Sequence, residues 1–257
     1  MEMTTADQVR ICTPKELPAD LNAKAAATAA GINPVNAPFG PAAAGLSGEE
    51  IAVLTSKYWG VAGRRLKVTF LEPIALNLRR RILSHMNSWY TGGANIRFTY
   101  TADPAAQVRV TREGDGYWSY LGTDVGLIPQ NEPTMSLQGF SMTTPDSEFF
   151  RVVRHETGHT MGFPHEHMRK ELVARIDPAK AYPYFLRTQG WDKTTVDQQV
   201  LTPLDDVQIM ATPPDQTSIM CYQLPGSIMK DGQPILGGND INNSDLTFAA
   251  KIYPKSG

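Results

Sequence analysis

Histidine is unevenly distributed along this chain, and its clustering constrains the fold more than any other feature. Four of the five histidines lie in one thirteen-residue stretch, HETGHTMGFPHEH, at positions 155–167. On an α-helix His155 and His159 are one turn apart and project from the same face, so their rings can converge on one point. Gly162 can adopt a left-handed conformation that turns the chain back, and His165 follows three residues later. The stretch therefore predicts a helix, a tight turn and three imidazoles that meet.

Three imidazoles with no thiolate among them suit Zn²⁺ and leave a fourth coordination position for water. Zinc lowers the pKa of its bound water and polarises a carbonyl oxygen. Glu156, next to the first of these histidines, can take the water proton as general base and later pass it to the departing amine. The pattern thus predicts peptide-bond hydrolysis without a covalent intermediate, with one zinc ion bound to His155, His159 and His165.

Two alternatives compete with this interpretation. The histidines could be core or surface residues that cluster by chance, but the five fixed positions of HExxHxxGxxH arise by chance in roughly one of 10⁵ chains of this length. A purely structural zinc site usually has four protein ligands, often cysteines. Here only three ligands and a well-placed carboxylate are evident in the sequence.

The residues before the cluster have the features of a helix start. Thr144 can cap the helix and Pro145 suits its first position. Asp146 and Glu148 place acids in the first turn, where the helix dipole favours them. We therefore expect a helix of about 17 residues that ends at Met161.

Composition excludes several classes of protein. The chain has 257 residues, enough to bury a full-sized core, and its net charge of −2 gives no electrostatic basis for binding nucleic acid or an anionic membrane. No apolar run approaches the length of a membrane-spanning helix, and the opening MEMTTADQVRICT lacks the pattern of a signal peptide. Cys12 and Cys221 can form at most one bridge. We expect partners other than nucleic acid or membrane, and stability that comes from packing.

The segments of the chain differ in composition. Residues 18–46 are rich in Ala, Pro, Gly and Asn with little periodicity, which is typical of a linker or of an extended arm on a surface. Residues 1–46 are therefore interpreted as an amino-terminal arm or pro-segment. Ser47 and Glu50 have capping-box spacing, which predicts that a compact domain of residues 47–257 begins there.

Periodicity predicts an α+β protein within that domain. Alternating apolar residues predict strands in residues 65–72, 96–100, 107–113 and 133–140. An apolar stripe of Leu78, Ile82, Met86 and Trp89 predicts a helix over residues 74–90. The part after Gly162 is irregular and rich in proline, up to a final helix near residues 243–254.

Cys12 lies ahead of an arm long enough to reach across a domain. Because a thiolate binds zinc well, Cys12 could occupy the open position and hold the enzyme latent. The alternative is a free cysteine packed in a shallow site, and the sequence leaves both interpretations open.

The histidine motif resembles the elongated zinc-binding motif of the metzincin metallopeptidases, and HEH after GFP resembles the astacin branch. SIMCY, residues 218–222, resembles the Met-turn of that family, and GYWSYLG, residues 116–122, resembles a segment ahead of its active-site helix. DLTFAAKIY, residues 245–253, resembles the carboxy-terminal helix. The resemblance covers roughly residues 64–254.

The resemblance assigns roles to several residues. It implies that His155, His159 and His165 are the zinc ligands and Glu156 the catalytic base. It implies that Tyr222 is an additional, phenolate-type zinc ligand that swings aside and supports the oxyanion during turnover.

Three further residues near the motif also receive roles. Met220 would form an apolar floor beneath the metal, although both Met220 and Tyr222 could instead be plain core residues. Glu166 resembles the glutamate that pairs with the mature amino terminus, and His167 would then support the site without binding metal.

The resemblance also implies a two-lobed metzincin-type fold. An upper lobe, about residues 47–162, would hold a twisted, mixed and mostly parallel sheet with two long helices. A lower irregular lobe, about residues 163–257, would end in the carboxy-terminal helix. A protein or peptide substrate would lie extended in the cleft between them and pair with an edge strand, for which we consider Met135–Leu137. That strand could equally be shielded by a loop, and Gln223–Met229 is a candidate wall of the specificity pocket.

We therefore expect a monomeric zinc endopeptidase. The alternatives are a zinc-binding but non-hydrolytic interaction protein on a metzincin scaffold, and an amidase that acts on a non-peptide amide. The presence of Glu156 favours an enzyme, because a binding module has no need of the base. The resemblance favours a secreted protein. Two departures from the family pattern are the absence of its usual set of disulfides and Cys221, which stands where histidine is usual.

Overall fold

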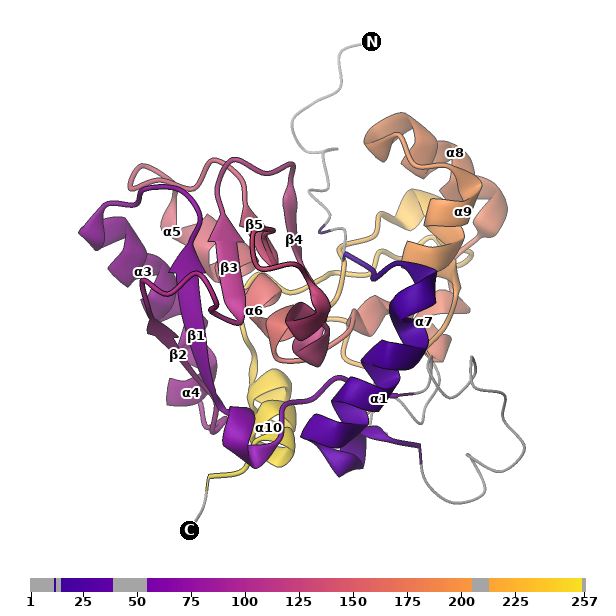
Figure 1. The fold of residues 1–257 in the computed structure, drawn as a ribbon. Helices are drawn as coiled ribbons and strands as arrows, with labels where there is room; N and C mark the ends of the chain where they lie inside the picture. Colours follow the sequence, from indigo (N-terminus) through magenta and orange to yellow (C-terminus); the bar gives the residue numbers. More distant parts are fainter. Residues whose placement is uncertain (1–11, 13–14, 39–54, 205–212, 256–257) are drawn as a thin grey trace.

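The computed structural model of the chain describes residues 12, 15–38, 55–204 and 213–255 (Figure 1). Its centre is a five-stranded mixed sheet in the order β2-β1-β3-β5-β4. The strands are β1 (Arg65–Phe70), β2 (Arg97–Tyr100), β3 (Val108–Thr111), β4 (Tyr117–Ser119) and β5 (Met135–Leu137). All neighbouring pairs are parallel except β4 with β5. The predicted α+β class and mostly parallel sheet are confirmed.

The sheet edge differs from the prediction for Met135–Leu137. This segment is a strand, as expected, but β5 lies between β3 and β4 and is paired on both sides. Its backbone is therefore unavailable to a substrate. The edge strand on this side of the sheet is β4, which lies in the GYWSYLG segment. Because β4 has only three residues, the sequence shows no clear alternating pattern there.

The predicted helix over residues 74–90 forms as two helices, α3 (Leu76–Met86) and α4 (Ser88–Thr91). The four residues of the predicted apolar stripe are all buried. Asn87 separates the two helices because its side chain bonds across to β2. It donates to the carbonyl of Phe98 at 2.9 Å and accepts from the Phe98 N–H at 3.1 Å.

The helix that carries the histidines is continuous but changes its winding. It comprises α5 (Asp146–Glu148), a π-helical segment (Phe149–Val153) and α6 (Arg154–Thr160). The expected cap from Thr144 is wrong. Its hydroxyl accepts a hydrogen bond from the Ser141 N–H in the preceding turn, and Pro145 occupies the N-cap position without a side-chain cap.

Part of the amino-terminal arm is helical, whereas its composition suggested a linker or an extended arm on a surface. Residues Asn22–Ile32 form helix α1, on which Ala25, Ala26 and Ala29 are buried, and the helix packs against the 3-10 segment Gly122–Leu127. Alanine is the strongest helix former, and here the small side chains also allow close packing. The predicted helix start at Ser47 and Glu50 lies outside the described residues.

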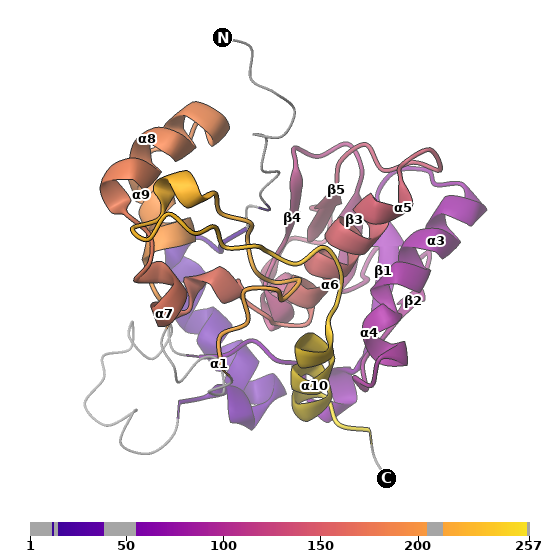
Figure 2. The same cartoon turned by 180° about the vertical axis from the view of Figure 1, so that it is seen from behind.

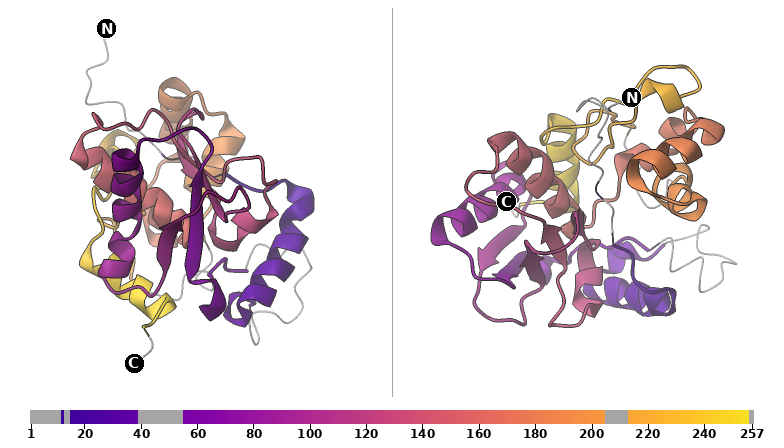
Figure 3. Two further views of the ribbon diagram at one scale, coloured as in Figure 1. Left: turned by 60° about the vertical axis from the view of Figure 1, so that its left-hand side comes forward. Right: turned by 90° about the horizontal axis from the view of Figure 1, so that it is seen from above.

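After Gly162 the chain forms short helices joined by irregular segments. They are the 3-10 segment Glu166–Met168, α7 (Lys170–Val173), α8 (Pro178–Gln189), α9 (Lys193–Val196), the π-helical segment Asp197–Leu201, the 3-10 segment Gly226–Ile228 and α10 (Asn243–Ile252). Figure 2 shows α3 and α4 on one flank of the molecule and α8 and α9 on the other, and the right-hand view of Figure 3, from above, shows the same separation. Among the described residues, none of the helices combines the length and apolarity needed to cross a bilayer.

Two hydrophobic cores correspond to these flanks. The first core is formed by the sheet, α3, α4 and the π-helical segment of the histidine helix, together with Ile219, Met220, Ala249 and Tyr253. The second core lies among α8, α9 and the segment around residues 221–235. It comprises Cys12, Leu172, Ile176, Ala181, Phe185, Val196, Val200, Cys221, Tyr222, Leu224, Ile228, Met229 and Ile235.

Candidate metal centre

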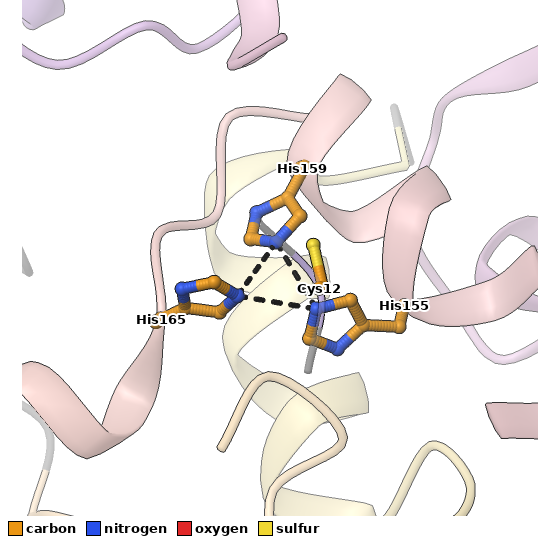
Figure 4. A group of neighbouring side chains, drawn as sticks. All are labelled: Cys12, His155, His159 and His165. Carbon is orange, nitrogen blue, oxygen red and sulfur yellow. Dashed lines mark hydrogen bonds between the residues drawn. The ribbon is translucent and has the colours of Figure 1, made fainter. Parts of the chain in front are cut away.

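The three predicted ligand histidines meet at one point (Figure 4). Nε2 of His155 lies 3.1 Å from Nε2 of His159 and 3.2 Å from Nε2 of His165, and the third side of this triangle is 3.0 Å. Three nitrogens bound to one tetrahedral Zn²⁺ at its usual bond length would be about 3.3 Å apart. The triangle therefore has the size that a single zinc ion requires.

The protonation of these rings explains why a cation fits between them. Nδ1 of His155 lies 2.6 Å from the Ile219 carbonyl oxygen, and Nδ1 of His159 lies 2.8 Å from the Phe163 carbonyl oxygen. A carbonyl oxygen only accepts, so each Nδ1 carries the proton and each Nε2 presents a lone pair. Burial lowers the pKa of His155 to about 4 and lowers the pKa of His159 well below its usual value, which keeps both rings neutral. Two lone pairs that face each other at this distance call for a cation.

Local geometry brings His165 to the same point. Gly162 ends the helix with a φ of 97°, and a Cβ at this position would lie 2.9 Å from the Lys57 carbonyl oxygen. The turn was predicted from the glycine, and it forms there for that reason. The Glu166 N–H then donates to the Met220 carbonyl at 2.8 Å, which fixes the residue after His165 against the Met-turn segment.

Glu156 lies beside the triangle and is 1% exposed. Its Oε2 accepts a hydrogen bond from Sγ of Cys12 at 3.4 Å. Burial raises the pKa of the Glu156 carboxyl to about 8, and the hydrogen bond from Cys12 opposes that rise. The Glu156 carboxyl group therefore stands at the side of the histidine triangle that the imidazoles leave open.

Cys12 occupies that open side. The ligand atoms of Cys12, His155, His159 and His165 all lie within 4.8 Å of one another, and the four side chains are buried. Burial raises the pKa of the Cys12 thiol, and the Glu156 carboxylate raises it further. The raised pKa favours the protonated thiol. A cation bound between the histidines would favour the thiolate instead, because its positive charge stabilises the deprotonated sulfur.

Met220 and Tyr222 are two residues apart but belong to different hydrophobic cores, Met220 to the first and Tyr222 to the second. Met220 packs under the helix, where a Cβ on Gly158 would come within 2.4 Å of its Sδ. Tyr222 belongs to the second core, and its hydroxyl donates to the Cys12 carbonyl oxygen. The Tyr222 ring lies 4.2 Å from that of His165 and stacks on that of His167 at 3.9 Å, measured between centroids.

Glu166 and His167 form their hydrogen bonds with other segments. Oε1 of Glu166 accepts from the Asp215 N–H at 3.1 Å, and Arg169 lies 3.6 Å from the same carboxylate. Nε2 of His167 bonds the Gln199 carbonyl at 2.9 Å. His167 thus supports Tyr222 through its ring and lies outside the candidate ligand set.

Asp245 is a residue of the site region that the sequence did not point to. Its carboxylate accepts from the Ser218 hydroxyl at 2.6 Å and from the Ile219 N–H at 3.0 Å. It also forms the capping box of α10 with Asn242. One acid therefore ties the start of α10 to the segment whose Ile219 carbonyl orients His155. The capping-box spacing was the only signal in the sequence that could have drawn attention to it.

A cavity of about 230 Å³ opens beside the triangle. Its walls are Val152 and His155 on the helix side, Tyr117 on β4, and Gln223 and Leu236 opposite. Of the predicted pocket wall, Gln223–Met229, only Gln223 lines this cavity. Leu224, Ile228 and Met229 belong to the second core instead.

Comparisons with known proteins agree with this geometry. The sequence profile of the Astacin peptidase family matches residues 54–236. Zinc metalloproteinase nas-27 of Caenorhabditis elegans is 33% identical over 73 residues, which are 28% of this chain and only 15% of that protein. The structure of myroilysin matches with a TM-score of 0.73 at 30% identity, over 79% of this chain and 98% of that one.

A hatching enzyme shows the same fold at a greater distance. High choriolytic enzyme 1, a hatching enzyme zinc-protease from the medaka fish Oryzias latipes, matches with a TM-score of 0.53 at 19% identity, over 78% of this chain and 96% of that one. The predicted family and the expected cofactor are confirmed, since the buried histidine group could hold one zinc ion. The chain belongs to the astacin family of zinc metallopeptidases.

Proposed function

We propose that this chain is a zinc-dependent endopeptidase, with His155, His159 and His165 as the metal ligands and Glu156 as the general base. The observation that carries the proposal is the triangle of Nε2 atoms, 3.0–3.2 Å on each side, with a buried carboxylate next to its open side. When bound there, Zn²⁺ would supply a Lewis acid that polarises the scissile carbonyl and lowers the pKa of a water molecule.

The chain's own residues would then move the protons and stabilise charge. Glu156 would accept a proton at Oε2, the atom that now faces Cys12 Sγ, and pass it to the departing amine. Tyr222 would donate its hydroxyl to the oxyanion that develops on the substrate. Its hydroxyl now reaches the Cys12 carbonyl, so it already lies next to the position that substrate would take.

A protein or peptide would bind in an extended conformation along β4. Among the strands that the structure describes, β4 is the last of the sheet on this side, and Tyr117 on it lines the cavity that holds His155. Lys15 of the arm already forms a parallel bridge with Tyr120, directly after β4, so the position accepts an added strand. We expect the active protein to be a monomer, which sedimentation velocity would check.

The arm holds the protein in a latent state in this proposal. Cys12 Sγ fills the open side of the triangle, and the Cys12 backbone engages Tyr222, so neither water nor substrate can take those places. The thiol would bind the metal as a thiolate and lose its proton on binding. We therefore favour a Cys12 that binds zinc and keeps the enzyme latent, a zinc switch, over a free cysteine packed in a shallow site.

Casein digestion tests the activity. We expect the Cys12→Ser variant to digest casein, 1,10-phenanthroline to stop it, and added Zn²⁺ to restore it. Glu156→Gln in the same background should keep one zinc per chain by metal analysis and lose digestion. A Glu156→Gln variant as active as its parent would refute the mechanism. A Cys12→Ser variant that binds zinc but does not digest casein would instead favour the non-hydrolytic interaction protein.

Latency has its own control. Lys24 is exposed on α1 of the same arm and has no part in the site. Lys24→Ala should be as latent as the parent chain, whereas Cys12→Ser should be active without processing. If the parent chain, Lys24→Ala and Cys12→Ser digested casein equally well, Cys12 would not be a latency switch, and the peptidase proposal would be unaffected.

A further inference from the structure

A second cavity lies at the edge of the sheet farthest from β4, where β1 and β2 begin. It has a volume of about 390 Å³. Its lining residues are Val61, Ala62, Arg64, Arg65, Tyr90, Asn95 and Arg97. Figure 1 shows β2 and α4 on the side of the sheet away from β4, and no residue lines both this cavity and the one beside the histidine triangle.

The cavity gathers positive charge without an acid among its lining residues. Arg64, Arg65 and Arg97 all line it, and none of them forms an ion pair with a residue that the structure describes. Arg65 and Arg97 are direct partners in the parallel register of β1 and β2. Both are exposed while the next pair, Leu66 and Phe98, is buried, so the two arginines share the outer face. Like charges directly opposite each other destabilise a sheet, and a ligand of opposite charge would relieve that repulsion.

The cations are held in place by neighbours that do not neutralise them. The Arg97 guanidinium stacks over the Tyr90 ring at 3.8 Å, and Nζ of Lys255 lies 5.0 Å from the centroid of the same ring. Nη1 of Arg64 donates to the Pro254 carbonyl at 2.9 Å. Nε of Arg64 is buried and has no hydrogen-bond partner within the described part of the chain. Stacking and backbone contacts thus orient these groups but leave donors unused.

We propose that this cavity is a binding site for a tetrahedral oxyanion, a phosphate or sulfate group, bound mainly by Arg65 and Arg97. Guanidinium groups form paired, charge-assisted hydrogen bonds with such oxyanions. Donors from two strands and from the segment before β1 surround the cavity, and a phosphate group offers at least three acceptor oxygens, whereas a carboxylate offers two. A doubly charged group also offsets more of the local positive charge than a single carboxylate does.

Binding of inorganic ions to the full chain tests the proposal. Calorimetric titrations with sodium phosphate and with sodium sulfate, at ionic strength held constant with chloride, should show saturable binding of one ion per chain. Arg65→Ala/Arg97→Ala should weaken binding by at least about 10-fold, because charge-assisted hydrogen bonds are lost. Circular dichroism of the double variant would confirm that it is folded.

A matched variant separates a site from general surface charge. Lys67 is exposed on β1 and Arg80 is exposed on α3, and neither lines the cavity. Lys67→Ala/Arg80→Ala removes the same charge and should bind phosphate and sulfate like the parent. Absence of saturable binding by the parent, or equal weakening in both double variants, would overturn the proposal.

Competition experiments distinguish a free ion from a group carried on a polymer. Heparin that competes with sulfate and depends on Arg65 and Arg97 would indicate a polymer-borne group, whereas heparin without effect would indicate a free ion. Both outcomes support the site. Poly-glutamate bound as tightly as heparin would overturn the assignment to a tetrahedral group. These results are independent of peptidase activity, which the Arg65→Ala/Arg97→Ala pair should leave unchanged in the Cys12→Ser background.

Discussion

The two hydrophobic cores contribute to the metal centre in different ways. On the first core lies the helix that carries His155, Glu156 and His159, and their spacing follows from the helical repeat. The second core contributes Tyr222 and Cys12, which arrive on irregular segments. The Met-turn crosses between them, since Met220 packs in the first core and Cys221 in the second.

This difference suggests that the histidine helix is held rigidly by the fold, whereas Cys12 can leave the site. The helix is fixed by the π-helical segment before it and by Met220 beneath it. In contrast, Cys12 is connected to the site through its contacts with Glu156 and Tyr222. We infer that the first core sets the geometry of the metal ligands, and that the second core determines access to them. The predictions below test this division, starting with the largest expected effect.

Catalysis should depend more on the helix than on the second core. In a Cys12→Ser background, Glu156→Gln should lower the rate of peptide cleavage by about 10²–10⁴-fold, because the general base is lost. Tyr222→Phe keeps the ring that stacks on His167 and should cost on the order of 10²-fold. Zinc content should be unchanged in both. A Tyr222→Phe variant more impaired than Glu156→Gln would contradict the division.

A methyl group under the helix should disturb the first core. Gly158→Ala would place a Cβ 2.4 Å from Sδ of Met220, and we expect a loss of about 1–3 kcal/mol in the free energy of unfolding. Gly126→Ala is the control, because a Cβ there meets no atom within 4 Å. Its free energy of unfolding should change by less than about 0.5 kcal/mol. Denaturant titration of both variants measures their free energies of unfolding. Equal changes in the two variants would mean that the Met220 side chain moves aside without cost.

Asp245 should connect α10 to the ligand histidines. Asp245→Asn weakens the bonds to Ser218 and the Ile219 N–H, which should cost about 1–2 kcal/mol of stability and lower zinc affinity. Asp240→Asn is the comparison, since Asp240 is half exposed in an ion pair with Arg154. That pair should contribute no more than about 1 kcal/mol. Chelator competition reports zinc affinity, and an unaffected affinity in Asp245→Asn would show that His155 is oriented without α10.

The smallest expected effect concerns pH and the ion pair between Lys57, which precedes β1, and Asp124. Lys57 lies 3.7 Å from Asp124, yet burial raises the pKa of Asp124 to about 6 and lowers the pKa of Lys57. The loss of solvation therefore exceeds the attraction between the two charges. Because the folded pKa of Asp124 is raised, its protonation stabilises the fold at low pH, and this contribution is lost as pH rises through about 6.

Thermal or denaturant unfolding at two pH values checks this effect. Between pH 7 and pH 5 the wild-type chain should gain about 1 kcal/mol relative to Asp124→Asn, which cannot take up the proton. A difference that stays constant, or that falls on acidification, would show that the pair is stabilised by its charges.

Local patterns predicted the elements that are long and periodic. The apolar stripe over residues 74–90 is buried as expected, and in β1 the alternation holds from Arg65 to Val68, because burial of one face imposes that period. It ends at Thr69, which is buried although it was expected on the outer face. The helix in the arm was missed because alanine carries little hydrophobic signal, although it favours helix strongly. The edge strand was misplaced because strand order depends on pairing between distant segments, which no local pattern encodes.

The sequence by itself determined that three imidazoles and one carboxylate would face a common point. Covalent geometry makes residues four apart on a helix share a face, and Gly162 permits the turn that returns His165. Only the tertiary structure decided that Cys12, 144 positions away from Glu156, closes that point, and that β4 forms the open edge beside it. Such contacts arise from the packing of the whole chain, so they are absent from any short stretch of it.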